Sequence, residues 1–337
     1  MQVTRNGSVW LGALEIPLPA ALSPQARAWL CEAGSRPDGT RNLTADADTV
    51  RSIVDAGYAQ QARRFLALHP GVSVEPVTLA GVRCWQVTPP DSPLRREDAV
   101  LINLHGGAFV AGRGAVFEAI PIAARTGLTV IAVDYRLAPE HPFPAAVEDA
   151  LAVYQGLMQL HSASRIALYG SSAGAVLGAQ TLVAADLAGV PLPAALGFFS
   201  GTADFTLACD SEAYLGIFGF SPDVRPVAQQ AGGYLRDWPR TDPRLSPQLA
   251  DLRAFPPTLC MTGTRDFFLG GTCQFHRALR QASVAAELFV FEGLPHVHWK
   301  MADLPETGQA LDIQAEFLLR HLPPLEGNAT SREGESR

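Results

Sequence analysis

The chain has 337 residues, of which 47% are hydrophobic and 18% charged, and its formal net charge is −7 at pH 7. A chain of this length and apolar content can bury a large core, as one domain or as a domain with a cap, and is not typical of disordered proteins. The negative charge, together with the lack of a basic run, argues against nucleic acid as a partner.

Cysteine usage and the N-terminal sequence favour a cytoplasmic protein. The five cysteines form no Cys-x-x-Cys pair, which predicts reduced thiols rather than disulfides or a metal site. Glu15, Pro17 and Pro19 interrupt the first apolar run, which is not typical of an export signal. Because no stretch of about 18 uncharged apolar residues exists, the sequence predicts no membrane span.

Residues 1–68 differ from the rest because they carry helical patterns ahead of any strong sheet signal. Ser23-Pro24 opens a predicted helix over Gln25 to Glu32, and a longer helical pattern runs from Thr49 to Leu68. From this order we expect the segment to form cap helices over the body that follows.

The body, residues 69–322, alternates predicted strands with helices. A hairpin is predicted over Val72 to Val87. Near-continuous apolar runs then predict buried parallel strands at Ala99–Leu104, Leu128–Val133, Ile166–Tyr169, Ala195–Ser200, Pro257–Thr262 and Ala286–Phe291. Helices are expected from about Ala145, after the strand at Ile166 as far as Gly189, and from Thr307 to His321. This pattern predicts an α/β fold with a parallel sheet.

Two segments of the chain look irregular. Residues 203–250 mix aromatic side chains with Gly and Pro, and we interpret them as an insertion that contributes to a cap or pocket wall, or else as surface packing. The polar tail, residues 323–337, is predicted to be disordered.

The most informative motif is Gly170-Ser171-Ser172-Ala173-Gly174, placed between a predicted strand and a predicted helix. In that context a Gly-x-Ser-x-Gly turn presents its central serine hydroxyl above the sheet, and the flanking glycines avoid collisions with the neighbouring strand and helix. The helix N-terminus then faces whatever Ser172 attacks.

A second motif, His105-Gly106-Gly107-Ala108, follows the buried strand at Ala99–Leu104. Backbone N–H groups at such a strand end can stabilise negative charge on a carbonyl oxygen, so we interpret Gly106 and Gly107 as part of an oxyanion hole. The N–H of Ala173 would complete it. His105 is expected to pack and to hydrogen-bond in this loop.

Ser172, Asp266 and His296 each follow a predicted strand, in the order nucleophile, acid, base. Chemistry collects at this end of parallel strands, and the order is the one expected for a nucleophile elbow. His296 would take the proton of Ser172 and pass one to the leaving group, while Asp266 would fix the imidazole tautomer.

Alternatives remain open from the residues alone. His298 could replace His296 as the base, and Asp204 could replace Asp266 as the acid. His296 and His298 could also form half of a zinc site, although no further Cys/His cluster accompanies them. Asp134 and Arg136 are interpreted as a structural ion pair.

With these motifs in hand, the chain resembles the hormone-sensitive lipase family of α/β-hydrolases, especially its bacterial esterases. The matching stretches are His105 to Ala108, Asp134 to Ala145, Gly170 to Gly174 and Glu292 to His296. The resemblance implies an α/β-hydrolase fold with an eight-stranded, mostly parallel sheet, helices on both faces and a helical cap. It also implies ester hydrolysis without a cofactor or metal, and it makes a homodimer plausible.

The chain departs from the family pattern at three places. Ala108 stands where the family has a third Gly, and Ser171 stands where many members carry Asp, which removes a charge beside the elbow. The acid is followed by Phe267-Phe268, where many relatives have Pro-Leu.

The leading hypothesis is therefore a serine carboxylesterase that hydrolyses short- to medium-chain esters, or lactones, through an acyl-enzyme on Ser172. An amide or formamide hydrolase with the same triad is the nearest alternative. A non-catalytic small-molecule receptor on the same fold is the third, and it is less consistent with the presence of His296.

Overall fold

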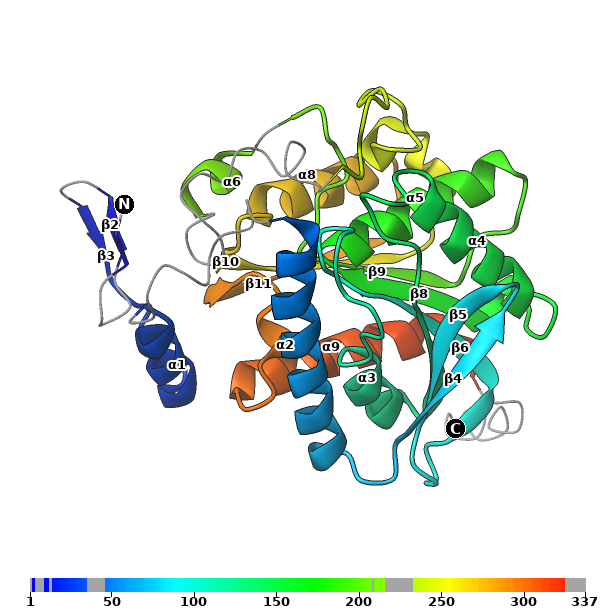
Figure 1. Ribbon diagram of the computed structural model, residues 1–337, viewed down its shortest axis with the longest axis horizontal. Helices are drawn as coiled ribbons and strands as arrows, with labels where there is room; N and C mark the ends of the chain where they lie inside the picture. Colours follow the sequence, from blue (N-terminus) through cyan, green and yellow to red (C-terminus); the bar gives the residue numbers. More distant parts are fainter. Residues whose placement is uncertain are drawn as a thin grey trace, which may run out of the picture.

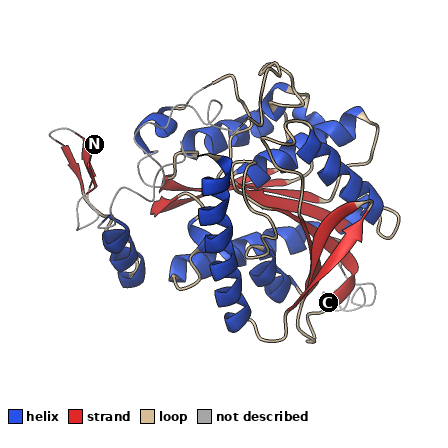
Figure 2. Ribbon diagram, viewed as in Figure 1, coloured by secondary structure: helices blue, strands red, loops and turns tan. Residues whose placement is uncertain are grey.

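An eight-stranded sheet runs through the centre of the protein, with helices on both of its faces (Figure 1 and Figure 2). The computed structural model describes residues 2–3, 9–11, 14–34, 46–207, 209–215 and 233–324. The strand order is β11-β10-β9-β8-β6-β7-β5-β4, and every pairing is parallel except those of β5 with β4 and β7. This is the mostly parallel α/β-hydrolase sheet that the sequence predicts.

The bounds of the elements follow the sequence order. The strands of the central sheet are β4 (Ser73–Leu79), β5 (Val82–Thr88), β6 (Arg96–Leu104), β7 (Leu128–Val133), β8 (Ile166–Ser171), β9 (Ala195–Phe199), β10 (Thr258–Arg265) and β11 (Ala286–Pro295). The α-helices are α1 (Pro24–Gly34), α2 (Ala47–Leu68), α3 (Ala119–Thr126), α4 (Ala145–Leu157), α5 (Ala173–Leu187), α6 (Asp210–Leu215), α8 (Leu269–Gln281) and α9 (Pro305–His321). Short 3₁₀ turns lie at Ala163–Arg165, Pro247–Leu249, Leu252–Ala254 and His298–Lys300, the last labelled η6.

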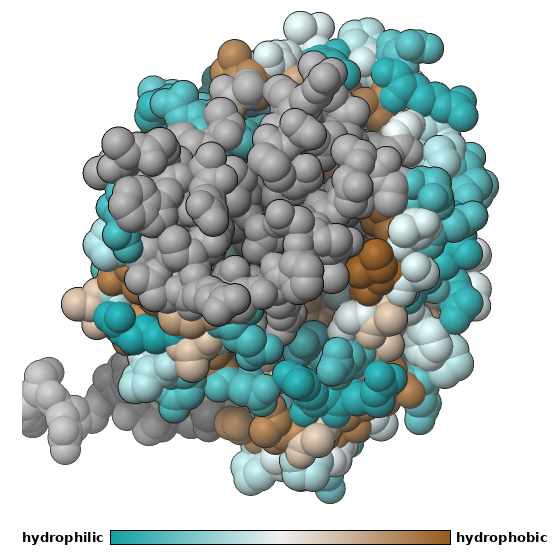
Figure 3. Space-filling view, turned by 60° about the vertical axis from the view of Figure 1, so that its left-hand side comes forward, coloured by the Kyte–Doolittle hydropathy of each residue, from teal (hydrophilic) through white to brown (hydrophobic). Residues whose placement is uncertain are grey.

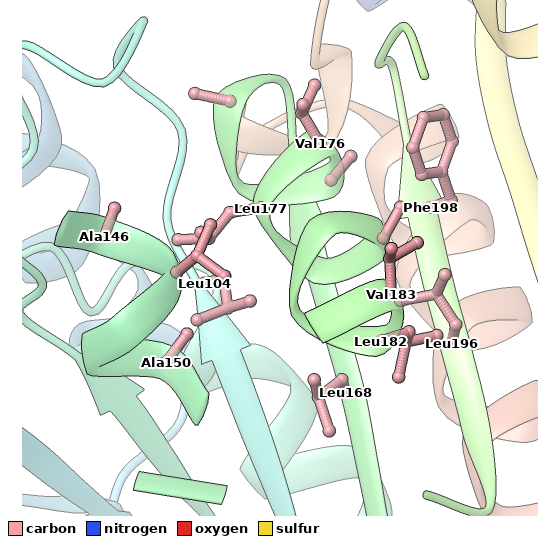
Figure 4. Close-up of a cluster of buried hydrophobic side chains, with 14 of the residues drawn as sticks. Leu104, Ala146, Ala150, Leu168, Val176, Leu177, Leu182, Val183, Leu196 and Phe198 are labelled. Carbon is pink, nitrogen blue, oxygen red and sulfur yellow. The ribbon is translucent and has the colours of Figure 1, made fainter. Parts of the chain in front are cut away.

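Two apolar layers hold the helices to the sheet. Helices α4, α5 and α8 cover one face, and α3 and α9 cover the other (Figure 1). Figure 4 shows the first layer, in which α5 side chains such as Leu177 and Leu182 lie over Leu104, Leu168 and Leu196 of the strands. Since β8, β9 and the Ala99–Leu104 part of β6 are covered on both faces, nearly all of these residues are apolar, which is why these strands are easy to predict.

The N-terminal segment contains both predicted helices. Helix α2 begins at Ala47 because the Asp46 carboxylate caps it, accepting the N–H of Thr49 at 2.9 Å. At the start of α1, Ser23 is bonded to Glu306 of α9, with Oγ to Oε2 at 2.9 Å. A small antiparallel sheet of β1 (Gln2–Val3), β2 (Val9–Leu11) and β3 (Leu14–Ile16) was not expected from the sequence. The role of residues 1–68 as a cap stays a prediction.

Other sequence expectations meet mixed outcomes. The hairpin and all six apolar strands are confirmed, although β6, β8, β10 and β11 extend beyond the predicted bounds. Helices α3 and α8 were not predicted.

The predicted Asp134–Arg136 ion pair is wrong, because Arg136 Nε bonds Asp149 Oδ1 of α4 at 2.9 Å while Asp134 pairs with Arg83 at 3.3 Å. Of the irregular 203–250 stretch, residues 208 and 216–232 lie outside the described residues, as does the tail beyond 324.

The described residues form neither a large apolar surface patch in the view of Figure 3 nor a helix suited to a membrane. On the face drawn in Figure 3, hydrophilic residues dominate the described part and hydrophobic ones form small separate groups. Within the described ranges, no helix combines the length and the apolar character that crossing a membrane requires.

We expect Gly174→Ala to unfold the protein or to lower its free energy of unfolding by about 3 kcal/mol or more. A Cβ at Gly174 would lie 1.8 Å from the carbonyl oxygen of Leu104, which is backbone and has no room to move. Thermal and urea unfolding of the two proteins measure the difference.

The matched control is Gly308→Ala in α9, where an added Cβ meets nothing within 4 Å. This variant should unfold at the wild-type temperature or be up to about 1 kcal/mol more stable, because Ala is the better helix former. Equal stability of the Gly174 variant and the wild type would refute the close-packing account of the turn.

Candidate active site

The turn between β8 and α5 is strained at Ser172. This residue has φ 57° and ψ −122°, a backbone conformation that non-glycine residues rarely adopt, and its N–H donates to the carbonyl of Phe199 at 2.8 Å. Both flanking glycines are required by space, since a Cβ at Gly170 would approach Leu104 O to 2.4 Å. The local structure is the strand–turn–helix that the motif predicts, with Ser172 immediately before the N-terminus of α5.

The loop that follows β6 lies directly against this turn. A Cβ at Gly106 would lie 3.0 Å from the carbonyl oxygen of Ser171 and 3.3 Å from the Cβ of Ser172. Gly107 has φ +126°, where a Cβ would collide with Ala111 O at 2.2 Å. Within the described residues, the backbone N–H groups of Gly106, Gly107 and Ala173 donate to no protein acceptor. The three open donors therefore lie in the loop packed on the serine turn and at the residue after Ser172.

His105 shapes this loop from inside the protein, as the sequence predicts. Its buried ring stacks on Tyr135 with centroids 4.2 Å apart, and its Nδ1 lies 2.7 Å from the carbonyl oxygen of Gly106. The Tyr135 hydroxyl donates to the carbonyl of His105 at 2.7 Å. A Cβ at Gly112 would lie 2.3 Å from His105 Nδ1, so the loop can close over the ring only with glycine there.

Helix α2 holds the same loop from outside. The Asp55 carboxylate accepts the N–H of Gly112 at 2.6 Å, and Arg51 Nε donates to the carbonyl of Val110 at 2.8 Å. Arg51 also donates from Nη2 to Ala138 O at 2.8 Å and is paired with Glu140. The N-terminal segment thus fixes the position of the glycine loop as well as lying beside it.

Asp266 and His296 are brought together, one after β10 and the other after β11. Asp266 Oδ1 lies 2.9 Å from His296 Nδ1, and the His296 side chain is 9% exposed whereas that of Asp266 is fully buried. The rings of Phe267 and Phe268 pack on the imidazole, with centroids 4.2 and 5.6 Å away. These two phenylalanines, where many relatives have Pro-Leu, therefore form an apolar wall beside His296.

Asp266 is kept ionised despite its burial. Burial alone would raise the pKa of this carboxyl, but the charge of His296 and hydrogen bonds from His296, Ser200 and the N–H of Phe268 outweigh it, so the pKa lies below the ordinary value. Thr262 Oγ1 also donates to Oδ2 at 3.0 Å. A charged Asp266 can hold His296 in the tautomer that carries its proton on Nδ1.

The rival residues are placed elsewhere. His298 is fully buried in η6, between Phe291 and Trp299, and neither ring nitrogen has a hydrogen-bond partner among the described residues. Asp204 accepts from Thr206 of its own loop, with N to Oδ1 at 2.7 Å. The structure thus pairs His296 with Asp266 and leaves His298 in the core.

The proposed zinc alternative has no support in side-chain placement. Across the described ranges, no group of three or more His, Cys, Asp or Glu side chains is arranged to hold a metal ion.

Sequence reasoning missed several residues that position the site. Ser200 and Thr262 complete the hydrogen bonds of Asp266, and Arg51 and Asp55 fix the glycine loop. Polar residues at the ends of predicted strands were a usable signal for the first two. The residues of α2 gave none, because a charge on an amphipathic helix most often faces solvent.

Part of the irregular 203–250 stretch covers the glycine loop. Tyr234 stacks on Phe109, with centroids 3.6 Å apart, and its hydroxyl donates to Gln180 Oε1 at 2.7 Å. Phe143 completes this buried aromatic group in an edge contact with Tyr234 and packs on Trp238. Tyr234 and Trp238 of this stretch therefore pack on or beside the glycine loop rather than on the distant surface.

Comparison with known proteins gives a consistent result. A family model described as an alpha/beta hydrolase fold matches residues 101–300. The chain is 35% identical over 275 residues to an acetyl-hydrolase of Streptomyces hygroscopicus, covering 77% of this chain and 86% of that protein. It is 31% identical over 294 residues to an esterase of Acinetobacter venetianus, covering 86% of this chain and 93% of that protein.

Solved structures agree with the sequence relatives. The crystal structure of an esterase, E25, superposes with a TM-score of 0.83 at 35% identity and covers 94% of this chain and 99% of that chain. An esterase from the bacterial hormone-sensitive lipase family superposes with a TM-score of 0.75 at 32% identity, covering 87% of this chain and 95% of that chain.

The burial of His298 predicts a pH-dependent stability. Burial lowers the pKa of this imidazole to about 3, so in acid the unfolded chain binds a proton that the folded chain excludes. Stability is therefore lost as pH falls below the unfolded value, by about 2 kcal/mol between pH 7.5 and pH 5. His298→Phe should remove this loss, which urea unfolding at both pH values measures.

The exposed His141 provides the control, because its replacement by Gln should leave the pH dependence as in the wild type. If His298→Phe and wild type lose the same free energy between the two pH values, His298 is not the buried neutral imidazole described above.

Proposed function

This chain belongs to the hormone-sensitive lipase family of α/β-hydrolases, and we propose that it is a serine carboxylesterase with Ser172 as nucleophile, His296 as general base and Asp266 as the acid that orients it. The observation that carries the proposal is the buried Asp266–His296 pair at 2.9 Å, at the same end of the sheet as the strained serine turn. A neutral imidazole held with its proton on Nδ1 leaves Nε2 able to accept the serine proton.

The reaction then follows in two halves. His296 Nε2 takes the proton of Ser172 as its Oγ attacks the ester carbonyl, and the resulting tetrahedral intermediate expels the alcohol, which receives that proton. The acyl group is left on Ser172. In the second half, His296 activates water, which attacks the acyl-enzyme, and the proton returns to Ser172 as the acid leaves.

The open N–H groups of Gly106, Gly107 and Ala173 support the stabilisation of the oxyanion. They lie in the loop packed on the serine turn and at the residue after Ser172, and they donate to no protein acceptor among the described residues, so they are available when negative charge develops on the carbonyl oxygen. Ala108, which stands in place of a third glycine, adopts φ 55°. No metal or cofactor is needed for any step.

We further propose that the substrates are short- to medium-chain esters. The relative from Streptomyces hygroscopicus is an acetyl-hydrolase, which favours small acyl groups. The phenylalanines beside His296, together with the contacts of α2 and Tyr234 with the glycine loop, support a site bounded by the cap segment and the described part of residues 203–250. A cytoplasmic location and a homodimer stay predictions from the sequence.

The test is hydrolysis of p-nitrophenyl esters from acetate to palmitate, with Ser172→Ala alongside. We expect the wild type to prefer the shorter acyl chains and the variant to lose about 1000-fold or more of kcat, because the remaining groups cannot form the acyl-enzyme. Ser162→Ala, which removes an exposed hydroxyl remote from the turn, should keep wild-type rates.

Retained hydrolysis in Ser172→Ala would contradict the assignment of the nucleophile. A wild type that is inert on esters but cleaves anilides would replace the esterase with the amidase alternative. A wild type inert on both, which binds without turnover, would favour the receptor alternative.

A further inference from the structure

A buried carboxyl group lies behind the serine turn and has no part in the mechanism above. Glu118 immediately precedes α3 and is only 6% exposed. Burying a carboxyl group is unfavourable unless hydrogen bonds or opposite charges compensate for its lost hydration. The contacts of Glu118 therefore indicate its role. Those contacts involve β6, β8 and the segment after β11, which carry the residues of the site.

The first contact is with β6, the strand that leads into the glycine loop. Asn103 Nδ2 donates to Glu118 Oε2 at 3.3 Å, two residues before His105. The backbone carbonyl of Glu118 is also tied to β8, since it accepts the Tyr169 hydroxyl at 3.4 Å. Glu118 thus bridges the strand of the oxyanion loop and the strand of the nucleophile.

The second contact runs through Ser171 to the histidine loop. Trp299 Nε1 donates to Ser171 Oγ at 3.0 Å, and Trp299 lies three residues after His296. An indole N–H is a donor only, so the hydroxyl hydrogen of Ser171 remains available for an acceptor. The Ser171 hydroxyl and the Trp299 indole both lie close enough to Glu118 to favour its ionised form.

We propose that Glu118 is a positioning residue, whose ionised carboxyl ties Asn103, Ser171 and Trp299 together and so fixes the serine turn relative to the oxyanion loop and His296. The inference rests on the proposed function, because it gives Glu118 a role in positioning that site. Glu118 touches neither substrate nor reacting atoms. The position of Glu118 also accounts for the serine at position 171, since a carboxylate at position 171 would face the carboxylate of Glu118.

The charge state of Glu118 is finely balanced. Burial raises its pKa, and the donor groups of Ser171, Asn103 and Trp299 together with the charge of Lys300 oppose this, which leaves the pKa at about 7. Oε1 is buried without a hydrogen-bond donor at normal distance among the described residues, so the ionised form is only partly compensated.

Other titratable groups face Glu118 from the elements packed on it. Lys300 of η6 is the cation. Burial lowers its pKa, and the charge of Glu118 offsets only part of this effect. Tyr58 of α2, Tyr135 of the loop after β7 and Tyr169 of β8 all have pKa values raised by burial and further by Glu118. These phenols stay neutral, so Glu118 is the acidic group of this cluster whose charge changes near pH 7.

The first test is Glu118→Gln, which keeps the shape of the side chain and removes its charge. We expect kcat for a short p-nitrophenyl ester to fall roughly 10- to 100-fold, with KM within about twofold, because the site is displaced while substrate binding is kept. Glu148→Gln, an exposed Glu of α4, is the matched control and should keep wild-type constants.

The pH profile separates positioning from a merely structural role. In the wild type, the acid limb of log kcat/KM should include the loss of the Glu118 proton, so it should be steeper than in Glu118→Gln by about one unit of slope. Glu118→Gln/Ser171→Asp moves a carboxyl to the neighbouring side chain and should recover a large part of the lost kcat.

A second measurement does not depend on turnover. Trp299 is buried next to Ser171, so its fluorescence should change as Glu118 ionises. We expect a transition centred at about pH 7 in the wild type that is absent from Glu118→Gln and from Trp299→Phe.

The outcomes are distinct. A wild type that hydrolyses no ester overturns the proposed function, while the fluorescence titration still decides the ionisation and linkage of Glu118. An active wild type with an equally active Glu118→Gln and an unchanged acid limb overturns the positioning role. So does a variant that loses kcat and thermal stability in parallel, keeps the wild-type slope and is not rescued by Ser171→Asp.

Discussion

The backbone of β6 and the backbone of α5 meet at Gly174, and the geometry of the whole site depends on this contact. The approach is so close that a single methyl group at Gly174 would overlap the carbonyl of Leu104. It lies two residues from the strained backbone of Ser172 and places that turn beside the point where β6 ends and the glycine loop begins. The proposed nucleophile and the open N–H donors therefore lie on two segments that are packed directly against each other.

The strain is sustained by groups at a distance from Ser172. Inside, the stacked rings of His105 and Tyr135 fill the loop, and outside, Asp55 and Arg51 of α2 hold its far end. Glu118 lies behind the serine turn and bonds to Asn103 of β6, the strand that leads into the glycine loop. Because each of these contacts restricts the loop or the turn before any substrate arrives, little reorganisation is required when charge develops on the substrate oxygen. Helix α2 of the N-terminal segment thus helps to position the loop that carries the proposed oxyanion donors.

Much of the fold was accessible from the sequence because the sheet is buried on both faces. Buried parallel strands must be apolar throughout, which made β7 and β9 readable almost to the residue. The site motifs were readable because glycine at positions 106, 107, 170 and 174 is enforced by sterics. Long-range polar pairing was not readable, since Arg136 pairs with Asp149 of a later helix, and Asp134 with Arg83 of an earlier strand. Likewise, no local sequence pattern indicates that Glu118, Ser171 and Trp299 lie close together in the fold.

The most direct test of the central claim is covalent labelling with a serine-reactive phosphonate, followed by mass spectrometry of the intact protein and of its peptides. We expect one adduct per chain, located on Ser172, and a labelling rate that falls at least about 100-fold in His296→Ala because the hydroxyl loses its base. An adduct on another serine, or labelling of His296→Ala at the wild-type rate, would contradict it.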